Sequence, residues 1–244
     1  MALLEVKSLS KAFGGLVAIK DLSFELEKGK ILGIIGPNGA GKTTLFNLIT
    51  GFDKADQGRV IFKGGDIAGL RPHELCKQGL ARTFQITQPF ANLTVLENVK
   101  IGAHNRVRSS REATEEALQV LERVGLIEKR REIASVLSIG HRKSLELAKA
   151  LATKPELILL DEVVGGLNTK ETNDMIARLK RINEEGTTIL IIEHVMKAIM
   201  TLSDRIVAIH YGEKIGEGEP AVISKDPRVI EAYLGEEYVL AKGS

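Results

Sequence analysis

The sequence predicts an α/β fold with a mostly parallel core sheet, an antiparallel β subdomain at its N-terminal end and an inserted α-helical subdomain. Three observations support this. Short apolar runs recur at residues 31–35, 157–160 and 189–192, and their length suits buried parallel strands. A glycine-rich turn joins the first run to a helix-like segment. Residues 86–150 carry apolar positions at helical spacing and almost no strand signal, which predicts the insertion.

Length and composition agree with a single globular domain over residues 1–244. A chain of 244 residues is long for one domain, but α/β domains often reach this size. Hydrophobic residues make up 43% and charged residues 27%, the usual balance of a soluble protein. We therefore expect one core, formed by residues 1–85 and 151–244, with residues 86–150 as the helical subdomain.

Charge and cysteine content exclude several classes of function. The net charge is only +2, so no strong field attracts nucleic acid, and we predict no nucleic-acid partner. The single cysteine, Cys76, cannot form an internal disulfide, fits a reducing compartment and is most simply a small core residue. The N-terminus does not resemble a signal peptide. Apolar runs are far shorter than the roughly 18 residues needed to cross a bilayer, so any membrane role is expected to be peripheral.

The N-terminal elements follow from local patterns. Residues 3–27 form short runs of Val, Leu, Ile and Phe, broken at Gly14-Gly15, which predict an antiparallel sheet edge. The run Ile31 to Ile35 predicts a buried strand, and a helix is expected from Lys42 onward.

The later elements return to the parallel sheet. Within the insertion, helical periodicity is shown by Ala117, Leu118, Leu121 and Val124. After it, a helical stretch at about 170–185 separates the two remaining apolar strands, as in a βαβ unit. The tail predicts a hairpin, with strands at Arg205 to His210 and Lys214 to Glu219 around Tyr211-Gly212, followed by a terminal helix near Arg228 to Leu234.

A phosphate-binding loop lies between the first apolar strand and the following helix. Residues 36–43 match the pattern G-x-x-x-x-G-K-[ST] at every fixed position. The segment reads Gly36, Pro37, Asn38, Gly39, Ala40, Gly41, Lys42 and Thr43. Glycines allow backbone N–H groups to surround a phosphate, and the helix directs its positive end at the anion. Lys42 is expected to reach the β- and γ-phosphates, Thr43 to bind Mg²⁺ and Thr44 to contact the α-phosphate.

A second motif supplies carboxylates at the end of the strand at residues 157–160. Asp161 and Glu162 follow this strand, and successive residues point to opposite faces, so the two carboxylates are expected to differ in role. Asp161 would hold Mg²⁺, while Glu162 would polarise the water that attacks the γ-phosphate. The alternative for an isolated acidic pair is a helix N-cap with a solvated neighbour. Together the two motifs predict ATP and Mg²⁺ as ligands.

With these two motifs, the whole chain resembles the ATP-binding cassette family of P-loop NTPases. Arg82-Thr83-Phe84-Gln85 is similar to the family's glutamine loop, so Gln85 would contact Mg²⁺ and the attacking water. Ile191-Ile192-Glu193-His194 resembles the switch strand, which implies that His194 contacts the γ-phosphate. Phe13 lies where the family places an aromatic that stacks on adenine. Core packing remains the alternative for Phe13 and for His194.

The segment Leu137 to His141 occupies the position of the family's signature motif, which usually reads L-S-G-G-Q. Ser138 and Gly140 are retained, and the resemblance implies that they touch the γ-phosphate of a partner subunit. Ile139 and His141 depart from the pattern. Two further departures follow Glu162: Val163 replaces the usual proline, and Asn168 stands where many members have aspartate.

One branch of the family is especially similar, the ATPase subunits of branched-chain amino-acid importers. The shared sequence segments are Arg82-Thr83-Phe84-Gln85, residues 94–99 (TVLENV) and residues 231–236 (EAYLGE). Importers of urea or other amides share most of these segments, so they do not identify the transported substrate.

The resemblance implies a motor subunit whose ATP hydrolysis drives transport. Two ATPase subunits, identical or different, would enclose ATP in a head-to-tail dimer. The other expected partners are transmembrane permease subunits and, through the complex, an extracytoplasmic substrate-binding protein. The expected location is the cytoplasmic face of the membrane. A regulatory subunit of low activity and a non-transport ATPase of the same family are the alternatives.

Overall fold

The computed structural model describes residues 2–85 and 87–233, which divide into two compact units. The first unit combines residues 1–72 with 190–244, and the second comprises residues 73–189. The second unit is larger than the expected insertion at residues 86–150, because the strands that flank this segment, β6 (Leu80–Arg82) and β7 (Leu157–Asp161), pair with each other in parallel. The limits of the helical subdomain at 86 and 150 therefore stay a prediction.

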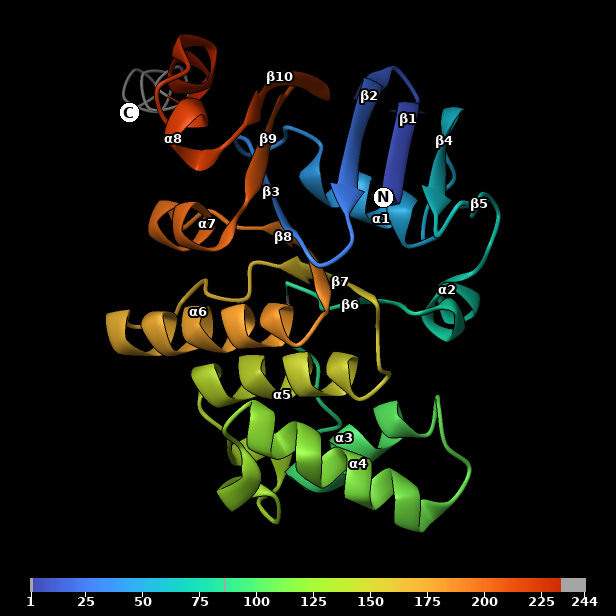
Figure 1. The fold of residues 1–244 in the computed structure, drawn as a ribbon, viewed down its shortest axis with the longest axis vertical. Coiled ribbons are helices and arrows are strands. Elements are labelled where there is room, and N and C mark those ends of the chain that lie inside the picture. Colours follow the sequence, from blue (N-terminus) through green and yellow to red (C-terminus); the bar gives the residue numbers. More distant parts are fainter. Residues whose placement is uncertain (1, 86, 234–244) are drawn as a thin grey trace. The chain divides into compact units, whose positions relative to one another are not determined.

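The first unit contains two hydrogen-bonded sets of strands together with helices, and of these helices α7 and α8 lie on the side of β9 away from β1 and β2 (Figure 1). Its elements are β1 (Ala2–Phe13), β2 (Leu16–Glu27), β3 (Ile31–Ile35), α1 (Lys42–Ile49), β4 (Gln57–Phe62), β5 (Gly65–Asp66), α7 (Met196–Leu202), β9 (Arg205–His210), β10 (Glu213–Gly218) and α8 (Pro220–Ile223). β8 (Thr188–Ile192) crosses the boundary between the units, and residues 227–233 are also helical. Leu234 lies outside the described residues, so only this part of the predicted terminal helix is confirmed.

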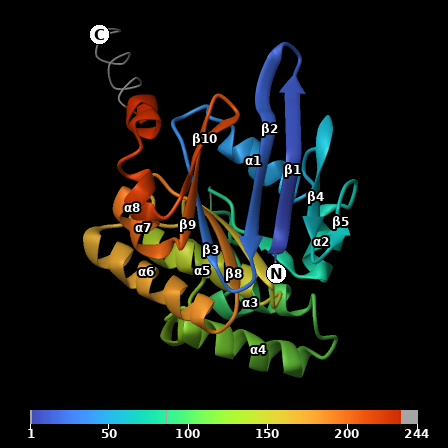
Figure 2. The same ribbon diagram turned by 45° about the horizontal axis from the view of Figure 1, so that its top comes forward.

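The N-terminal strands form an antiparallel sheet in the order β2-β1-β4-β5, which confirms the predicted subdomain. β1 and β2 make a long hairpin that reaches from the pair Leu4 and Leu26 to the pair Phe13 and Leu16 (Figure 2). The turn requires glycine, because Gly14 has a φ of +57°. Alternate residues such as Leu4 and Val6 are buried, which gives the sheet one apolar face.

The other strands of this unit follow the order β10-β9-β3-β8. β3 pairs in parallel with β9, and β9 turns back into β10 as the predicted hairpin. Every residue of β3 and β8 is buried, as expected for strands covered on both faces. α7 packs closely on β3, since a Cβ at Gly33 would lie 2.9 Å from Cδ1 of Ile199. β3 thus rigidly positions the loop that follows it.

The second unit is mainly helical (Figure 1). Its elements are α2 (Pro72–Gln78, starting at the boundary), β6, α3 (Val95–Ala103), α4 (Ser110–Arg123), the 3₁₀ turns Ile127–Lys129 and Ala134–Val136, α5 (Ile139–Leu151), β7 and α6 (Thr169–Glu184). α3, α4 and α5 confirm the predicted helical character between residues 86 and 150, and α6 matches the stretch expected at 170–185. α3 begins with a capping box between Thr94 and Glu97.

Candidate nucleotide-binding site

The phosphate loop lies between β3 and α1, in the first unit, and its geometry depends on glycine. Gly41 caps α1 with a φ of 100° and makes no side-chain cap hydrogen bond. A Cβ at Gly41 would lie 2.3 Å from the carbonyl oxygen of Ala18. The first N–H groups of α1 therefore have no side-chain cap and can bind an anion.

Lys42 is the buried cation of this loop. Its side chain is bound by the loop itself: Nζ donates to the carbonyl oxygens of Gly36 at 2.6 Å and Pro37 at 2.8 Å. Only 7% of the residue is exposed. A phosphate oxygen would form a charge-assisted hydrogen bond with this buried ammonium. The loop thus fits the polyphosphate that the motif predicts.

Gly36 starts the loop where the backbone passes close to β9. A Cβ at Gly36 would lie 2.2 Å from the carbonyl oxygen of Ile209, so no other residue fits without movement of the backbone. The N–H of Gly36 donates to the hydroxyl of Tyr233 at 2.9 Å. Both polar groups of this residue are thus engaged, the N–H by Tyr233 and the carbonyl by Lys42.

Most of the other predicted nucleotide contacts of the first unit lie at its surface. Asn38, Gly39 and Thr43 are exposed, Ala40 is buried and Thr44 is half-buried. Phe13 is 46% exposed, and the Nζ of Lys11 lies 5.2 Å from its ring centre. His194 follows β8 and is also exposed. Core packing was the alternative for Phe13 and His194, and their exposure shows that it is wrong.

The second unit holds the carboxylates at the end of β7. Asp161 is buried and forms an ion pair with Arg82 of β6, with 2.9 Å between Nη2 and Oδ2. The side chains of Arg82 and Asp161 are only 6% and 5% exposed. The hydroxyl of Thr83 accepts a hydrogen bond from the N–H of Asp161 at 3.2 Å. Arg82 therefore balances the charge of the residue that we expect to bind Mg²⁺.

Glu162 has an uncommon backbone conformation, and its side chain and carbonyl are both hydrogen-bonded. Its φ is +51°, in the left-handed region that residues other than glycine rarely occupy. Nε2 of Gln85 donates to its Oε2 at 2.8 Å. Its carbonyl accepts hydrogen bonds from Nζ of Lys143 and from the N–H of Gly165. No helix begins at this pair, because α6 starts later with Asn168 as its N-cap, so the N-cap alternative for Asp161 and Glu162 is wrong.

The signature segment begins α5. Ser138 is the N-cap: its Oγ accepts from the N–H of His141 at 3.4 Å and lies 3.0 Å from Nδ1 of the same residue. Ile139 is 62% exposed. A Cβ at Gly140 would lie 2.7 Å from Oε1 of Glu171. Thus a side chain at position 140 would displace the carboxylate of Glu171, while Ser138 stays at the surface with its hydroxyl engaged by His141.

Asn168 caps the N-terminus of α6, at a position where many members of the family have aspartate. Its side-chain oxygen accepts from the N–H of Glu171 at 2.9 Å, and Glu171 accepts in return from the N–H of Asn168 at 3.1 Å. Asparagine and aspartate are similarly good N-cap residues. The substitution therefore preserves the start of α6.

His141 gives the second unit a pH-dependent stability. Burial is the main cause that lowers the pKa of His141 below 6.5, and the charge of Lys129 adds to it, while Glu132 and Glu171 oppose it and Arg178 lowers it further. The unfolded chain then binds the proton more readily than the folded chain, so stability is full above about pH 6.5 and falls as the pH decreases.

We expect the unfolding free energy to decrease less steeply between about pH 7 and pH 5 in a His141→Gln variant than in the wild-type protein. Urea denaturation at several pH values measures the difference. His104→Gln, at an exposed histidine of the same unit, is the control. Parallel pH profiles for wild type and His141→Gln would contradict the prediction.

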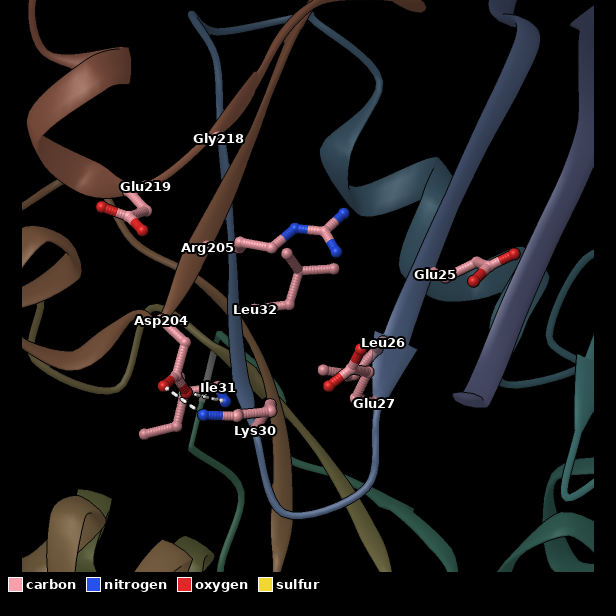
Figure 3. A pocket seen from close by; sticks show the side chains of 10 residues that line it. All are labelled: Glu25, Leu26, Glu27, Lys30, Ile31, Leu32, Asp204, Arg205, Gly218 and Glu219. Carbon is pink, nitrogen blue, oxygen red and sulfur yellow. Dashed lines mark hydrogen bonds and ion pairs between the residues drawn. The ribbon is translucent and has the colours of Figure 1, made fainter. Parts of the chain in front are cut away.

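A cavity of about 430 Å³ opens in the first unit at the start of β3 and β9 (Figure 3). The ion pair between Lys30 and Asp204 lies on its wall, with Glu25 and Glu27 projecting from β2. This cavity includes Leu32 but no residue of the phosphate loop, which follows the opposite end of β3. It is therefore separate from the phosphate loop.

Three residues next to the predicted site were missed in the sequence. Arg82 pairs with Asp161, Lys143 binds the carbonyl of Glu162, and Tyr233 binds Gly36. Arg82 and Tyr233 lie in two of the sequence segments that support the branch resemblance, but nothing in those segments indicates these contacts.

No helix in the described part of the chain is long and apolar enough to cross a membrane.

Comparison with known proteins agrees with this geometry. The family model "ABC transporter" matches residues 19–165, and the model "Branched-chain amino acid ATP-binding cassette transporter" matches residues 213–239. A crystal structure of a nucleotide-free ATP-binding cassette from an ABC transporter superposes with a TM-score of 0.88 at 35% identity, covering 96% of this chain and 99% of that one. The ADP conformation of such a cassette gives the same TM-score at 36% identity over 96% of this chain and 99% of that one.

The chain belongs to the ABC transporter family, as an ATP-hydrolysing cassette. Among named relatives, it is 39% identical to the high-affinity branched-chain amino acid transport ATP-binding protein BraF of Pseudomonas aeruginosa, over 96% of this chain and 98% of BraF. It is 40% identical to the corresponding protein LivG of Escherichia coli K12, with the same coverage. The fold, the family and the nucleotide-binding class predicted from the sequence are thus confirmed.

Proposed function

We propose that this chain is the ATPase subunit of an importer for branched-chain amino acids. The observation that carries this proposal is the similarity to BraF and LivG over 96% of the chain, joined by the match of residues 213–239 to the branched-chain family model. The partners are transmembrane permease subunits and an extracytoplasmic substrate-binding protein. The chain acts as a peripheral subunit at the cytoplasmic face of the membrane.

In this proposal the two units supply complementary chemistry. Gly36 to Thr44 bind the phosphates, and Phe13 stacks on adenine. Mg²⁺ would be held by Thr43, Gln85 and Asp161, and it would neutralise charge on the phosphates. Glu162 accepts a proton from the attacking water, while Lys42 and His194 stabilise the charge that develops on the γ-phosphate.

Catalysis further requires a second ATPase subunit, whose Ser138 and Gly140 or their equivalents complete the site. A related cassette, 28% identical with a TM-score of 0.81, has been solved as a dimer, which supports pairing of this kind. ATP then favours the closed dimer, and hydrolysis shifts the population toward the open one. The permease subunits follow this shift.

The test is transport by the complete complex in proteoliposomes. The chain is co-purified with the membrane proteins that bind it, supplied with the matching binding protein and loaded with internal ATP. We expect uptake of leucine, isoleucine or valine that requires ATP. Uptake of urea instead, with none of the three amino acids, would refute the assigned cargo but not the motor function.

A second candidate is a regulatory subunit of low intrinsic turnover, favoured by the contact between Ser138 and His141. If Nδ1 accepts the serine proton, the hydroxyl cannot donate it to a phosphate. If Nδ1 instead carries the ring proton, it donates to the serine oxygen and leaves the serine proton available, so donation by Ser138 depends on the tautomer of His141. Wild-type ATPase activity in the complex that equals that of a Glu162→Gln complex would favour this second candidate.

A further inference from the structure

Tyr233 links the helical stretch at residues 227–233 to the phosphate loop. Its hydroxyl accepts the hydrogen bond from the N–H of Gly36 at 2.9 Å, although 197 positions separate the two residues. The stretch is anchored on β10: Val229 and Ala232 are buried, and a Cβ at Gly216 would lie 3.3 Å from Cγ2 of Val229. The hydroxyl is therefore presented by a packed helix and not by a free chain end.

Gly36 is held from both sides, but the two contacts differ in what nucleotide binding does to them. The carbonyl of Gly36 is bound by Lys42, the residue proposed to bind the β- and γ-phosphates. When Lys42 turns to the phosphates, this contact weakens. The hydrogen bond from the N–H to Tyr233 does not use Lys42, so it can persist when Lys42 turns. Tyr233 would then keep the first peptide of the loop in place.

We propose that Tyr233 is a positioning residue of the phosphate loop, and that the helical stretch at 227–233 is thereby coupled to nucleotide binding. The proposal rests on the proposed role of Gly36 to Thr43 as the phosphate-binding loop. A loop that is already ordered binds its ligand without a further cost of ordering. Because coupling between two sites is reciprocal, nucleotide must in turn stabilise the helical stretch.

The first test is nucleotide affinity in a Tyr233→Phe variant, which keeps the ring and removes the hydroxyl. Loss of one neutral hydrogen bond predicts binding of Mg-ATP that is about three- to tenfold weaker. Titration with a fluorescent ATP analogue measures it. Tyr211→Phe, on an exposed tyrosine of the β9–β10 turn, is the matched control and should bind as wild type does. Equal affinities for wild type and Tyr233→Phe would overturn the proposal.

A Tyr233→Ala variant separates the hydroxyl from the ring. If the hydroxyl carries the effect, Tyr233→Phe should lose most of the affinity that Tyr233→Ala loses. Wild-type affinity in Tyr233→Phe together with weak binding in Tyr233→Ala would assign the effect to ring packing and refute the proposed contact. Circular dichroism verifies that both variants are folded.

The second test uses reciprocity, which a merely structural tyrosine would not satisfy. Addition of Mg-ADP should slow amide hydrogen exchange at residues 228–233 in the wild-type chain, and this slowing should be at least halved in Tyr233→Phe. Slowing of equal size in both proteins would overturn the coupling. If wild type binds nucleotide and Lys42→Ala binds equally well, the assignment of the loop itself fails. If instead Lys42→Ala binds weakly while Tyr233→Phe binds as wild type does, the loop assignment holds and only the role of Tyr233 fails.

Discussion

Replacing Glu162 with glutamine is expected to reduce ATP turnover of the assembled transporter by about 100-fold or more, the usual contribution of a general base. Two contacts of residue 162 are preserved in this variant. Glutamine retains the oxygen that can accept from Nε2 of Gln85, and the contact with Lys143 uses the main-chain carbonyl of residue 162. The main change is therefore the loss of the negative charge and of its ability to accept a proton.

The same variant should accumulate in its ATP-bound state. Because binding groups outside residue 162 are unchanged, ATP still joins two subunits but is not hydrolysed. We expect a dimer on a sizing column in Mg-ATP and a monomer in Mg-ADP. If the variant forms a dimer only after a second ATPase subunit is added, the natural assembly is a heterodimer.

Phosphate release and nucleotide affinity should be measured together on the reconstituted complex. Glu115→Gln is the matched control, since Glu115 lies on the exposed surface of α4 in an ion pair with Arg111. Unchanged turnover in Glu162→Gln would remove Glu162 from the role of base. A fall in turnover that is explained by lost ATP affinity would assign it to binding and not to chemistry.

Much of the fold could be predicted because its signals are local. The strand at Ile31 to Ile35, the glycine-rich loop and the helix from Lys42 are consecutive, and each has its own pattern. The apolar run at Leu157 similarly identifies β7. Weaker patterns were missed, among them β4 and the short helix α2. The first three residues of β4 are exposed and α2 has only seven residues, so both carry little periodicity.

The candidate site could be predicted in its motifs but not in the contacts that support them. Arg82 and Asp161 are 79 positions apart, and Gly36 and Tyr233 are 197 apart. Such pairs are brought together by strand pairing and helix packing, and no periodicity within one segment reveals them. The left-handed backbone conformation of Glu162 could not be predicted from the sequence either, because glycine is the residue that usually indicates it. The missing proline at Val163 pointed to this turn without indicating its shape.

Replacing Arg82 with methionine is expected to destabilise the protein by about 3–5 kcal/mol, the usual cost of removing one partner of a buried ion pair. Methionine preserves much of the apolar stem, so the loss is mainly that of the charge. Asp161 would then remain buried without the guanidinium that lies 2.9 Å from its Oδ2. Urea denaturation in the presence of EDTA measures the effect with no contribution from a bound metal.

The size of this effect depends on burial, and two comparisons isolate that cause. Arg111→Met breaks an ion pair whose side chains are 88% and 58% exposed, so the change should be much smaller. Adding Asp161→Asn to Arg82→Met removes the buried negative charge and should restore part of the stability, because a neutral amide costs less to bury than a carboxylate. Equal effects of Arg82→Met and Arg111→Met would mean that Asp161 gains no stability from Arg82. The ion pair would then serve only to orient the carboxylate that we expect to bind Mg²⁺.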